Sequence, residues 1–195
     1  MRTIRTVCVY CASSSRVAPV YFEAARTLGR LLAERNIRCV YGAGGTGLMG
    51  ALADAVLQKG GEITGIIPQF MYAHGWCHPG LKEVEVTTDI HSRKQRMATL
   101  SDGVIALPGG CGTLEELLEI ITWKQLGLYL HPIVLLNING YYDPLLQMLH
   151  RASEEHFMRP EHQTMWSVSY TPQEAVELLY SAPEWDENQY KLAVI

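Results

Sequence analysis

Residues 108–116, Pro-Gly-Gly-Cys-Gly-Thr-Leu-Glu-Glu, are the part of the sequence most suited to chemistry. They follow the apolar run 103–107 and lead into an amphipathic stretch, a pattern that predicts a strand, a glycine loop and the start of a helix. Glycines let the backbone come close to an anion, and a helix N-terminus offers unpaired N–H groups and a partial positive charge. We therefore predict a phosphate-binding loop, which we call the phosphate seat. Its residues are Gly109, Gly110, Gly112 and Thr113.

Two carboxylates, Glu115 and Glu116, follow in the first predicted helical turn. A carboxylate beside a phosphate seat can stabilise the positive charge that develops on a sugar when its glycosidic bond breaks. Thr113 and Glu116 also have the Thr-x-x-Glu spacing of a capping box. A plain cap does not need three glycines, which cost conformational entropy. The glycines therefore favour phosphate binding. Thr113 could cap the helix, contact the phosphate, or do both.

Two other loops follow predicted strands. The loop 42–50, which contains Gly44 and Gly47, resembles a dinucleotide fingerprint, although a tight strand-to-helix turn is the alternative. The next predicted strand ends without the acidic residue that would hold the ribose of NAD, so we predict no dinucleotide cofactor. Ser13 and Ser14 follow the first strand and could donate hydroxyl groups to a ribose or a phosphate, or form only a turn.

Three cations, Arg93, Lys94 and Arg96, fall in the early turns of a predicted helix. Positive charge there opposes the helix dipole by roughly 0.3–1 kcal/mol per residue. We expect these side chains to face a phosphate or a carboxylate, with a solvated charged face as the alternative. His74, Cys77 and His78 lack the spacing of a standard zinc site, so we predict no metal.

The elements that must position these residues alternate between strand and helix. The periodicity predicts strands at 6–10, 38–41, 62–67, 83–87, 103–107, 133–136 and 168–170. It predicts helices at 20–35, 48–58, 90–100, 113–126, 142–155 and 172–179, with an irregular segment at 69–82. This order indicates an α/β, Rossmann-like, doubly wound fold with a mainly parallel sheet and helices on both faces. Ligands bind beyond the carboxyl ends of such strands, so the loops 11–15, 42–50 and 108–113 should share one edge.

Composition limits the protein class. The chain has 195 residues and a net charge of -4. Its length predicts one domain, which we place at 1–180 as the nucleotide-binding unit that the loops indicate, followed by a polar tail over 181–195. The sequence has no basic tract that would indicate a nucleic-acid polymer as partner. It also has no apolar run long enough for a membrane span. Charges within 1–10 argue against a signal peptide, so we expect a cytoplasmic protein. Five scattered cysteines do not suggest a disulfide framework.

Together these motifs resemble the LONELY GUY (LOG) family of cytokinin riboside 5′-monophosphate phosphoribohydrolases, also described as possible lysine decarboxylases. The family hallmark Pro-Gly-Gly-x-Gly-Thr-x-x-Glu is matched by residues 108–116, and its Arg-Lys pair by Arg93 and Lys94. The family's Gly-Leu-Met-Gly loop is matched by residues 47–50. The resemblance covers about residues 7–142.

The resemblance implies that Glu116 and Arg93 are catalytic and that the loop glycines, Thr113 and Glu115 contact substrate. It implies hydrolysis of AMP or an N6-modified nucleoside 5′-monophosphate to free base and ribose 5-phosphate, without a cofactor. It also implies a homodimer, for which the apolar helix 114–126 is a suitable interface. The chain departs from the family at Ala43, where many members have glycine, and in segment 69–82, which lacks the substrate-contacting glutamate of plant members. His74 and His78 are the candidates to replace that glutamate.

Two other functions are open. The first is a nucleotide or molybdenum-cofactor carrier without catalysis, since such carriers resemble this superfamily. Retention of Glu116 and Arg93 favours the enzyme, because a carrier needs no carboxylate near an anomeric carbon. The second is lysine decarboxylation, which normally requires pyridoxal phosphate on a lysine. None of the five lysines lies in a recognisable motif for that cofactor.

Overall fold

The computed structural model describes residues 2–186, in which seven strands form one sheet with every neighbouring pair parallel. The strands are β1 (Thr6–Tyr10), β2 (Arg38–Tyr41), β3 (Ile63–Pro68), β4 (Glu83–Thr87), β5 (Val104–Ala106), β6 (Ile133–Leu136) and β7 (Ser167–Ser169). Their order across the sheet is β4-β3-β2-β1-β5-β6-β7. The order reverses between β1 and β5, which makes the carboxyl ends of these two strands the expected ligand-binding point.

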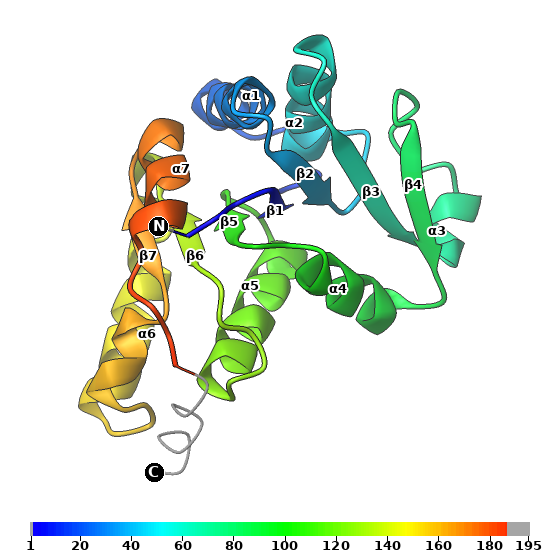
Figure 1. The fold of residues 1–195 in the computed structure, drawn as a ribbon. Coiled ribbons are helices and arrows are strands. Elements are labelled where there is room, and N and C mark those ends of the chain that lie inside the picture. The colour runs from blue at the N-terminus through cyan, green and yellow to red at the C-terminus, as the bar shows by residue number, and fades with distance from the viewer. Residues whose placement is uncertain (1, 187–195) are drawn as a thin grey trace.

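Helices cover both faces of the sheet, as predicted (Figure 1). They are α1 (Pro19–Glu34), α2 (Gly47–Gln58), α3 (Gln69–Ala73), α4 (Ile90–Thr99), α5 (Cys111–Gln125), α6 (Asp143–Glu154) and α7 (Pro172–Ser181). The short 3-10 helices are η1 (Ile138–Gly140) and η2 (Pro160–Thr164). Helices α1, α2 and α7 pack on one face, and α4, α5 and α6 lie on the other. The doubly wound Rossmann-like fold is thereby confirmed.

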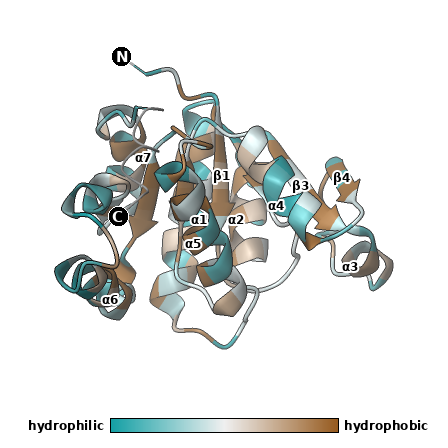
Figure 2. Ribbon diagram, turned by 90° about the horizontal axis from the view of Figure 1, so that it is seen from below, coloured by the Kyte–Doolittle hydropathy of each residue, from teal (hydrophilic) through white to brown (hydrophobic). Residues whose placement is uncertain are grey.

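The central part of the sheet is apolar on both sides because β1, β2, β3, β5 and β6 each supply residues to two cores. Val7 and Val9 of β1 belong to the core under α1, α2 and α7, whereas Cys8 and Tyr10 belong to the core under α4 and α5. Successive strand residues point to opposite faces, so a strand buried on both faces must be apolar throughout. Figure 2 shows β1 in hydrophobic colour along its length, enclosed by helices of mixed hydropathy.

The structure corrects the sequence predictions mainly at α3 and α5. Segment 69–82 is not wholly irregular, since α3 forms at its start; that single turn buries none of its residues, so it has no amphipathic period to detect. Helix α5 begins at Cys111, two residues before the predicted start at Thr113, with Gly110 as its N-cap. The capping-box interpretation of Thr113 and Glu116 is therefore wrong, and Glu115 and Glu116 lie in the second helical turn.

The C-terminal region of the described chain stays on the domain. Ser181 is the last residue of α7, and Trp185 is 7% exposed within the core that α5 covers. The remainder of the predicted polar tail, residues 187–195, lies outside the described residues. Within residues 2–186, no helix is both long and apolar enough to cross a membrane. All five cysteines are free.

Lys124 of α5 is a buried cation whose charge is poorly solvated. Its side chain is 2% exposed, and its Nζ donates a 2.9 Å hydrogen bond to the carbonyl of His131. Burial, with a smaller contribution from the positive charge of Arg2, lowers the pKa of Lys124 from 10.5 to about 8. Because the folded pKa lies below the unfolded one, stability rises with pH between these values, where only the unfolded chain still binds the proton.

We expect Lys124→Met to raise the free energy of unfolding at pH 7 by about 2 kcal/mol. The difference between the pKa values 10.5 and 8 corresponds to about 3 kcal/mol, and loss of the hydrogen bond returns about 1 kcal/mol. Urea unfolding at pH 7 and pH 10 measures the effect. The advantage of the variant should shrink at pH 10, where the wild-type lysine is largely neutral. A variant less stable than wild type at pH 7 would contradict the prediction.

Candidate active site

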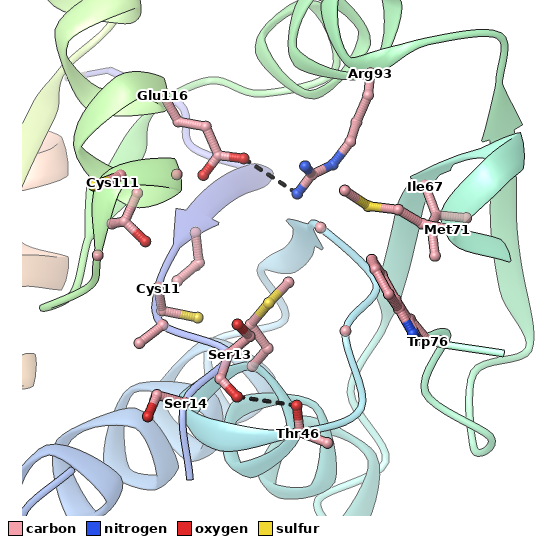
Figure 3. Close-up of a pocket in the computed structure, with 18 residues that line it drawn as sticks. Cys11, Ser13, Ser14, Thr46, Ile67, Met71, Trp76, Arg93, Cys111 and Glu116 are labelled. Carbon is pink, nitrogen blue, oxygen red and sulfur yellow. Dashed lines mark hydrogen bonds and ion pairs between the residues drawn. The ribbon is translucent and has the colours of Figure 1, made fainter. Parts of the chain in front are cut away.

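The three glycine- and serine-rich loops meet beyond the carboxyl ends of β1, β2 and β5, where they line a cavity of about 740 Å³ (Figure 3). This confirms that they share one edge of the sheet. The cavity has the size of a small-ligand site. It lies where the strand order reverses, which is where doubly wound sheets bind ligands.

The N-terminus of α5 forms one side of the cavity. Gly110, Cys111, Gly112 and Thr113 all line it. The first N–H groups of a helix have no acceptor within the helix, and no side chain caps α5. Helices α1, α2, α3 and α6 also lack a side-chain cap, but the first turn of α5 lines the cavity. This end of α5 is therefore suited to an anion.

Gly109 has a different role from the other loop glycines. A Cβ at Gly109 would lie 2.1 Å from Oγ1 of Thr113, so the glycine makes room for that side chain, and Gly109 itself does not line the cavity. A Cβ at Gly110 or Gly112 would meet nothing within 4 Å. Their bare backbone leaves space on the cavity side for a ligand to approach closely.

Glu116 and Arg93 form a buried ion pair in the cavity wall (Figure 3). Glu116 lies one helical turn after Gly112 and therefore shares its face of α5. Arg93 comes from α4, and its Nη2 is 3.1 Å from Oε1 of Glu116; the two side chains are 12% and 10% exposed. The Arg93 Nε also donates to the carbonyl of Ile66, at 3.2 Å. Burial raises the pKa of Glu116, and the charge of Arg93 opposes that rise.

Gly42, at the end of β2, gives Arg93 its place. A Cβ at position 42 would lie 1.9 Å from Nη2 of Arg93 and 2.8 Å from Cε of Met49. Contacts of this length are impossible, so either the guanidinium or the loop would have to move. The absence of a side chain at Gly42 therefore sets the geometry of the Arg93–Glu116 pair.

We expect Gly42→Ala to lower kcat/KM for AMP, a substrate that the resemblance implies, at least about tenfold, equivalent to about 1.4 kcal/mol of transition-state stabilisation. The reason is displacement of Arg93 from Glu116. The control is Gly60→Ala, because Gly60 has a φ of +70° and lies outside the cavity. That variant suffers backbone strain without touching Arg93. Equal activity of the two variants, with similar thermal unfolding, would contradict the role of Gly42.

The other two cations of α4 do not reach the cavity. Lys94 is buried against carboxylates of α5: it contacts Glu115 and lies 3.1 Å from Glu119. Arg96 donates from Nε to both oxygens of Glu85 on β4, at 2.7 and 2.9 Å. Adjacent helical positions point about 100° apart, which turns Lys94 away from the direction of Arg93. Arg96, three positions after Arg93, lies near the same helix face, but its pairing with Glu85 holds it away from the cavity. The three cations of α4 thus face carboxylates, as one alternative predicted. Lys94, Arg96 and Glu115, which were expected to contact substrate, are absent from the cavity lining.

The loops after β1 and β2 form the opposite side. Ser13, Ser14 and Gly44 line the cavity as predicted. Thr46, which the sequence reasoning missed, also lines it and donates from Oγ1 to the carbonyl of Ser13 at 3.0 Å. Gly47 lies behind this wall with a φ of +61°, and a Cβ there would be 2.4 Å from the Ser13 backbone. Gly47 thus allows the two loops to approach each other.

Segment 69–82 supplies an apolar wall that the sequence reasoning did not identify. Met71 and Trp76 line the cavity next to Ile67 of β3, and Trp76 is 55% exposed (Figure 3). His74 and His78 do not line it, so the expectation that one of them replaces the plant glutamate stays a prediction without support from the cavity lining. His78 is buried, with Nε2 3.2 Å from Asp54 and Nδ1 accepting from the N–H of Gly80. Residues 2–186 contain no group of three or more potential metal-ligating His, Cys, Asp or Glu side chains.

Fold and site together define a Rossmann-like α/β protein whose cavity at the switch point holds the uncapped N-terminus of α5 and a buried carboxylate. The family model described as "Possible lysine decarboxylase" matches residues 49–179. Cytokinin riboside 5′-monophosphate phosphoribohydrolase LOG7 of Arabidopsis thaliana is 43% identical, over 96% of this chain and 87% of its own length. LOG3 of the same plant is 45% identical, over 90% and 81%. The chain belongs to this family, which confirms the resemblance to LOG proteins.

A solved structure supports the fold. The molybdenum cofactor binding protein of Rippkaea orientalis superposes with a TM-score of 0.68, over 93% of this chain and 98% of its own. Sequence identity is 22%. At that identity the likeness concerns the fold alone.

Proposed function

We propose that the protein hydrolyses the N-glycosidic bond of AMP or of N6-modified, cytokinin-type nucleoside 5′-monophosphates, releasing the free base and ribose 5-phosphate. The observation that carries the proposal is the buried Glu116–Arg93 pair one helical turn from the uncapped N-terminus of α5, in a single cavity. The activity named for the two Arabidopsis relatives supports it.

The chemistry follows from the charges in the cavity. A 5′-phosphate at the start of α5 directs the ribose toward Glu116, and this positioning lowers the barrier. As the bond from C1′ to the base breaks, its electron pair leaves with the base, which takes up a proton, and positive charge develops on the ribose. Ionised Glu116 stabilises that charge and orients the water whose oxygen bonds to C1′. Arg93 keeps Glu116 ionised despite its burial.

The apolar wall suits the base. Trp76 and Met71 offer a flat ring and a flexible thioether, groups that pack on purines and on alkyl substituents. An adenine nucleotide with an apolar N6 substituent carries that substituent at one end and its 5′-phosphate at the other. With the phosphate at the start of α5, the substituent would lie at this wall. Relative rates with AMP, isopentenyl-AMP, GMP and CMP would define the preferred base.

Incubation of the purified protein with AMP, followed by chromatography for adenine and ribose 5-phosphate, tests the proposal. The enzyme releases both in equal amounts. A nucleotide or molybdenum-cofactor carrier, the alternative, binds its ligand and releases no base. Binding of every nucleotide tested without any base release would therefore reject the enzyme in favour of the carrier.

Lysine decarboxylation receives no support from the cavity residues. Among residues 2–186, none of the side chains that line the cavity is a lysine, so none of these could hold pyridoxal phosphate there as a Schiff base. Lys94 and Lys124 are buried elsewhere, against Glu119 and the His131 carbonyl respectively. The purified protein should lack the absorbance near about 420 nm that such a cofactor gives.

The proposed assembly is a homodimer in the cytoplasm, with the nucleotide as substrate and no nucleic-acid polymer or membrane as partner. Leu118 of α5 and Leu126 directly after it are 39% and 47% exposed, an apolar surface suited to a second copy. Trp123 instead packs partly buried against the core. Light scattering measures the assembly; a fully active monomer of 21.8 kDa would contradict the dimer. Cell fractionation tests the location.

A further inference from the structure

The loop between β5 and α5 is held by its carbonyl groups. The carbonyl of Leu107 accepts from the hydroxyl of Tyr142 at 2.7 Å, and that of Gly109 accepts from the hydroxyl of Tyr141 at 2.6 Å. Between them, the Pro108 carbonyl accepts from the N–H of Ala12 at 3.3 Å. Three successive carbonyls at residues 107–109, directly before or within the predicted phosphate seat, thus have donors outside the loop, two of them supplied by adjacent tyrosines.

These tyrosines come from a rigid corner after β6. Asn139 and Gly140 have φ values of 53° and 69° in the left-handed region, which turns the chain sharply before Tyr141. The Asn137 side chain accepts from the N–H of Tyr142 and donates to Asp143, each at 2.7 Å. The corner is therefore fixed by its own hydrogen bonds, and both hydroxyl groups are presented to the loop from a stable base.

Peptide geometry links these hydrogen bonds to the cavity. The carbonyl of Gly109 and the N–H of Gly110 belong to the same peptide unit and, in a trans peptide, point in opposite directions. No cis peptide occurs among residues 2–186. A hydroxyl that fixes the Gly109 carbonyl therefore also fixes the direction of the Gly110 N–H, and Gly110 lines the cavity.

We infer that Tyr141 and Tyr142 are positioning residues for the phosphate seat, Tyr141 by orienting the Gly110 amide and Tyr142 by anchoring the preceding Leu107. This inference rests on the proposed function, in which that seat binds a 5′-phosphate. Core packing does not account for Tyr141, which is 40% exposed. Its ring contacts Tyr21 and Tyr142 edge-on, contacts that phenylalanine would keep. The hydroxyl is the part of Tyr141 with a specific task.

The test is Tyr141→Phe, measured first by calorimetric titration with ribose 5-phosphate and with inorganic phosphate. We expect the dissociation constant of ribose 5-phosphate to rise about fivefold, the effect of one hydrogen bond. KM for AMP should rise by a similar factor, with a smaller change in kcat. The matched control is Tyr170→Phe, because Tyr170 is 63% exposed and outside the cavity. The control should bind ribose 5-phosphate as wild type does.

Tyr142→Phe is the second variant. Burial raises the pKa of Tyr142, so its phenol stays protonated and donates at all working pH values. Loss of the Tyr142 hydroxyl should weaken phosphate binding and also lower the thermal unfolding temperature, because the hydroxyl is buried. Tyr141→Phe should leave that temperature within a few degrees of wild type, which separates loop positioning from general stability.

The outcomes distinguish this inference from the proposed function. Unchanged ribose 5-phosphate affinity in Tyr141→Phe, within about twofold, a change smaller than one hydrogen bond gives, overturns the inference even if wild type cleaves AMP. Weakened phosphate binding in a protein that never cleaves AMP supports the inference and rejects the enzyme. Failure of wild type to bind either phosphate probe overturns both, because the seat would then not bind phosphate.

Discussion

Glu116→Gln is expected to reduce base release from AMP by about 10³-fold or more, the scale of losing one preorganised electrostatic group, with little change in AMP affinity. The substitution preserves the size of the side chain and removes the charge that would stabilise the ribosyl cation. The phosphate seat at Gly110 and Gly112 is left intact, which is why binding should persist. Steady-state rates and calorimetric titration on the same preparations separate the two effects.

The matched control for this prediction is Glu119→Gln. Glu119 is also on α5 but faces Lys94, outside the cavity. Its loss should change activity little, although it weakens the ion pairs between α4 and α5. Near-normal turnover in folded Glu116→Gln would remove Glu116 from the mechanism.

The pH profile gives an independent check on Glu116. Burial raises its pKa above the ordinary value of 4.5. The mechanism requires the ionised form, so kcat/KM should fall as the pH drops through that raised pKa, on an acidic limb above pH 4.5. The residual activity of Glu116→Gln should lack this limb.

The second large effect concerns the phosphate. We expect the protein to cleave AMP but to discriminate against adenosine by roughly 10⁴-fold in kcat/KM, the range seen when a site built on polar contacts loses the contacted group. Without a phosphate, the amide groups at the start of α5 have no anion to bind. The binding energy of the phosphate also holds the ribose against Glu116, so its absence should lower kcat as well as raise KM.

Base release from AMP and adenosine at matched concentrations measures this discrimination. Added inorganic phosphate provides the control, because it should inhibit AMP cleavage by occupying the same seat. Turnover of adenosine within about tenfold of AMP, far from the expected discrimination, would show that the loop at residues 108–113 is not a phosphate seat. The site would then be that of a nucleoside hydrolase, or the loop would be purely structural.

Local sequence sufficed for the elements with strong periodic or apolar patterns. The bounds of β1, β2, β4 and β6 agree with the predicted ones. Strands β1, β2 and β6 are short and buried, and they give apolar runs between turn residues, whereas the edge strand β4 is marked by alternating glutamate and valine. The convergence of the three loops also follows from the parallel topology alone. The start of α5 could not be placed in the same way, because Cys111 and Gly112 are weak helix formers that the tertiary structure nevertheless places in the helix.

The composition of the cavity was only partly predictable. Spacing along α4 separates Lys94 from Arg93, but Arg93 and Arg96 are three positions apart and share nearly the same helix face, so the sequence does not say which of these two faces the cavity. Met71 and Trp76 come from a segment without periodicity, and their side chains have no chemical type that marks a site. The contacts of Tyr141 and Tyr142 with the loop join residues about 30 positions apart; no local pattern reports such a contact.

The position of the apolar wall has a consequence for how this protein could diversify. Trp76 and Met71 lie between β3 and the outermost strand β4, whereas Glu116 and the phosphate seat lie at the middle of the sheet. Changes at the sheet margin disturb little of the core, since α3 buries none of its residues. Selection or a mutant library restricted to residues 69–76 could therefore alter base preference while the residues that break the glycosidic bond stay unchanged.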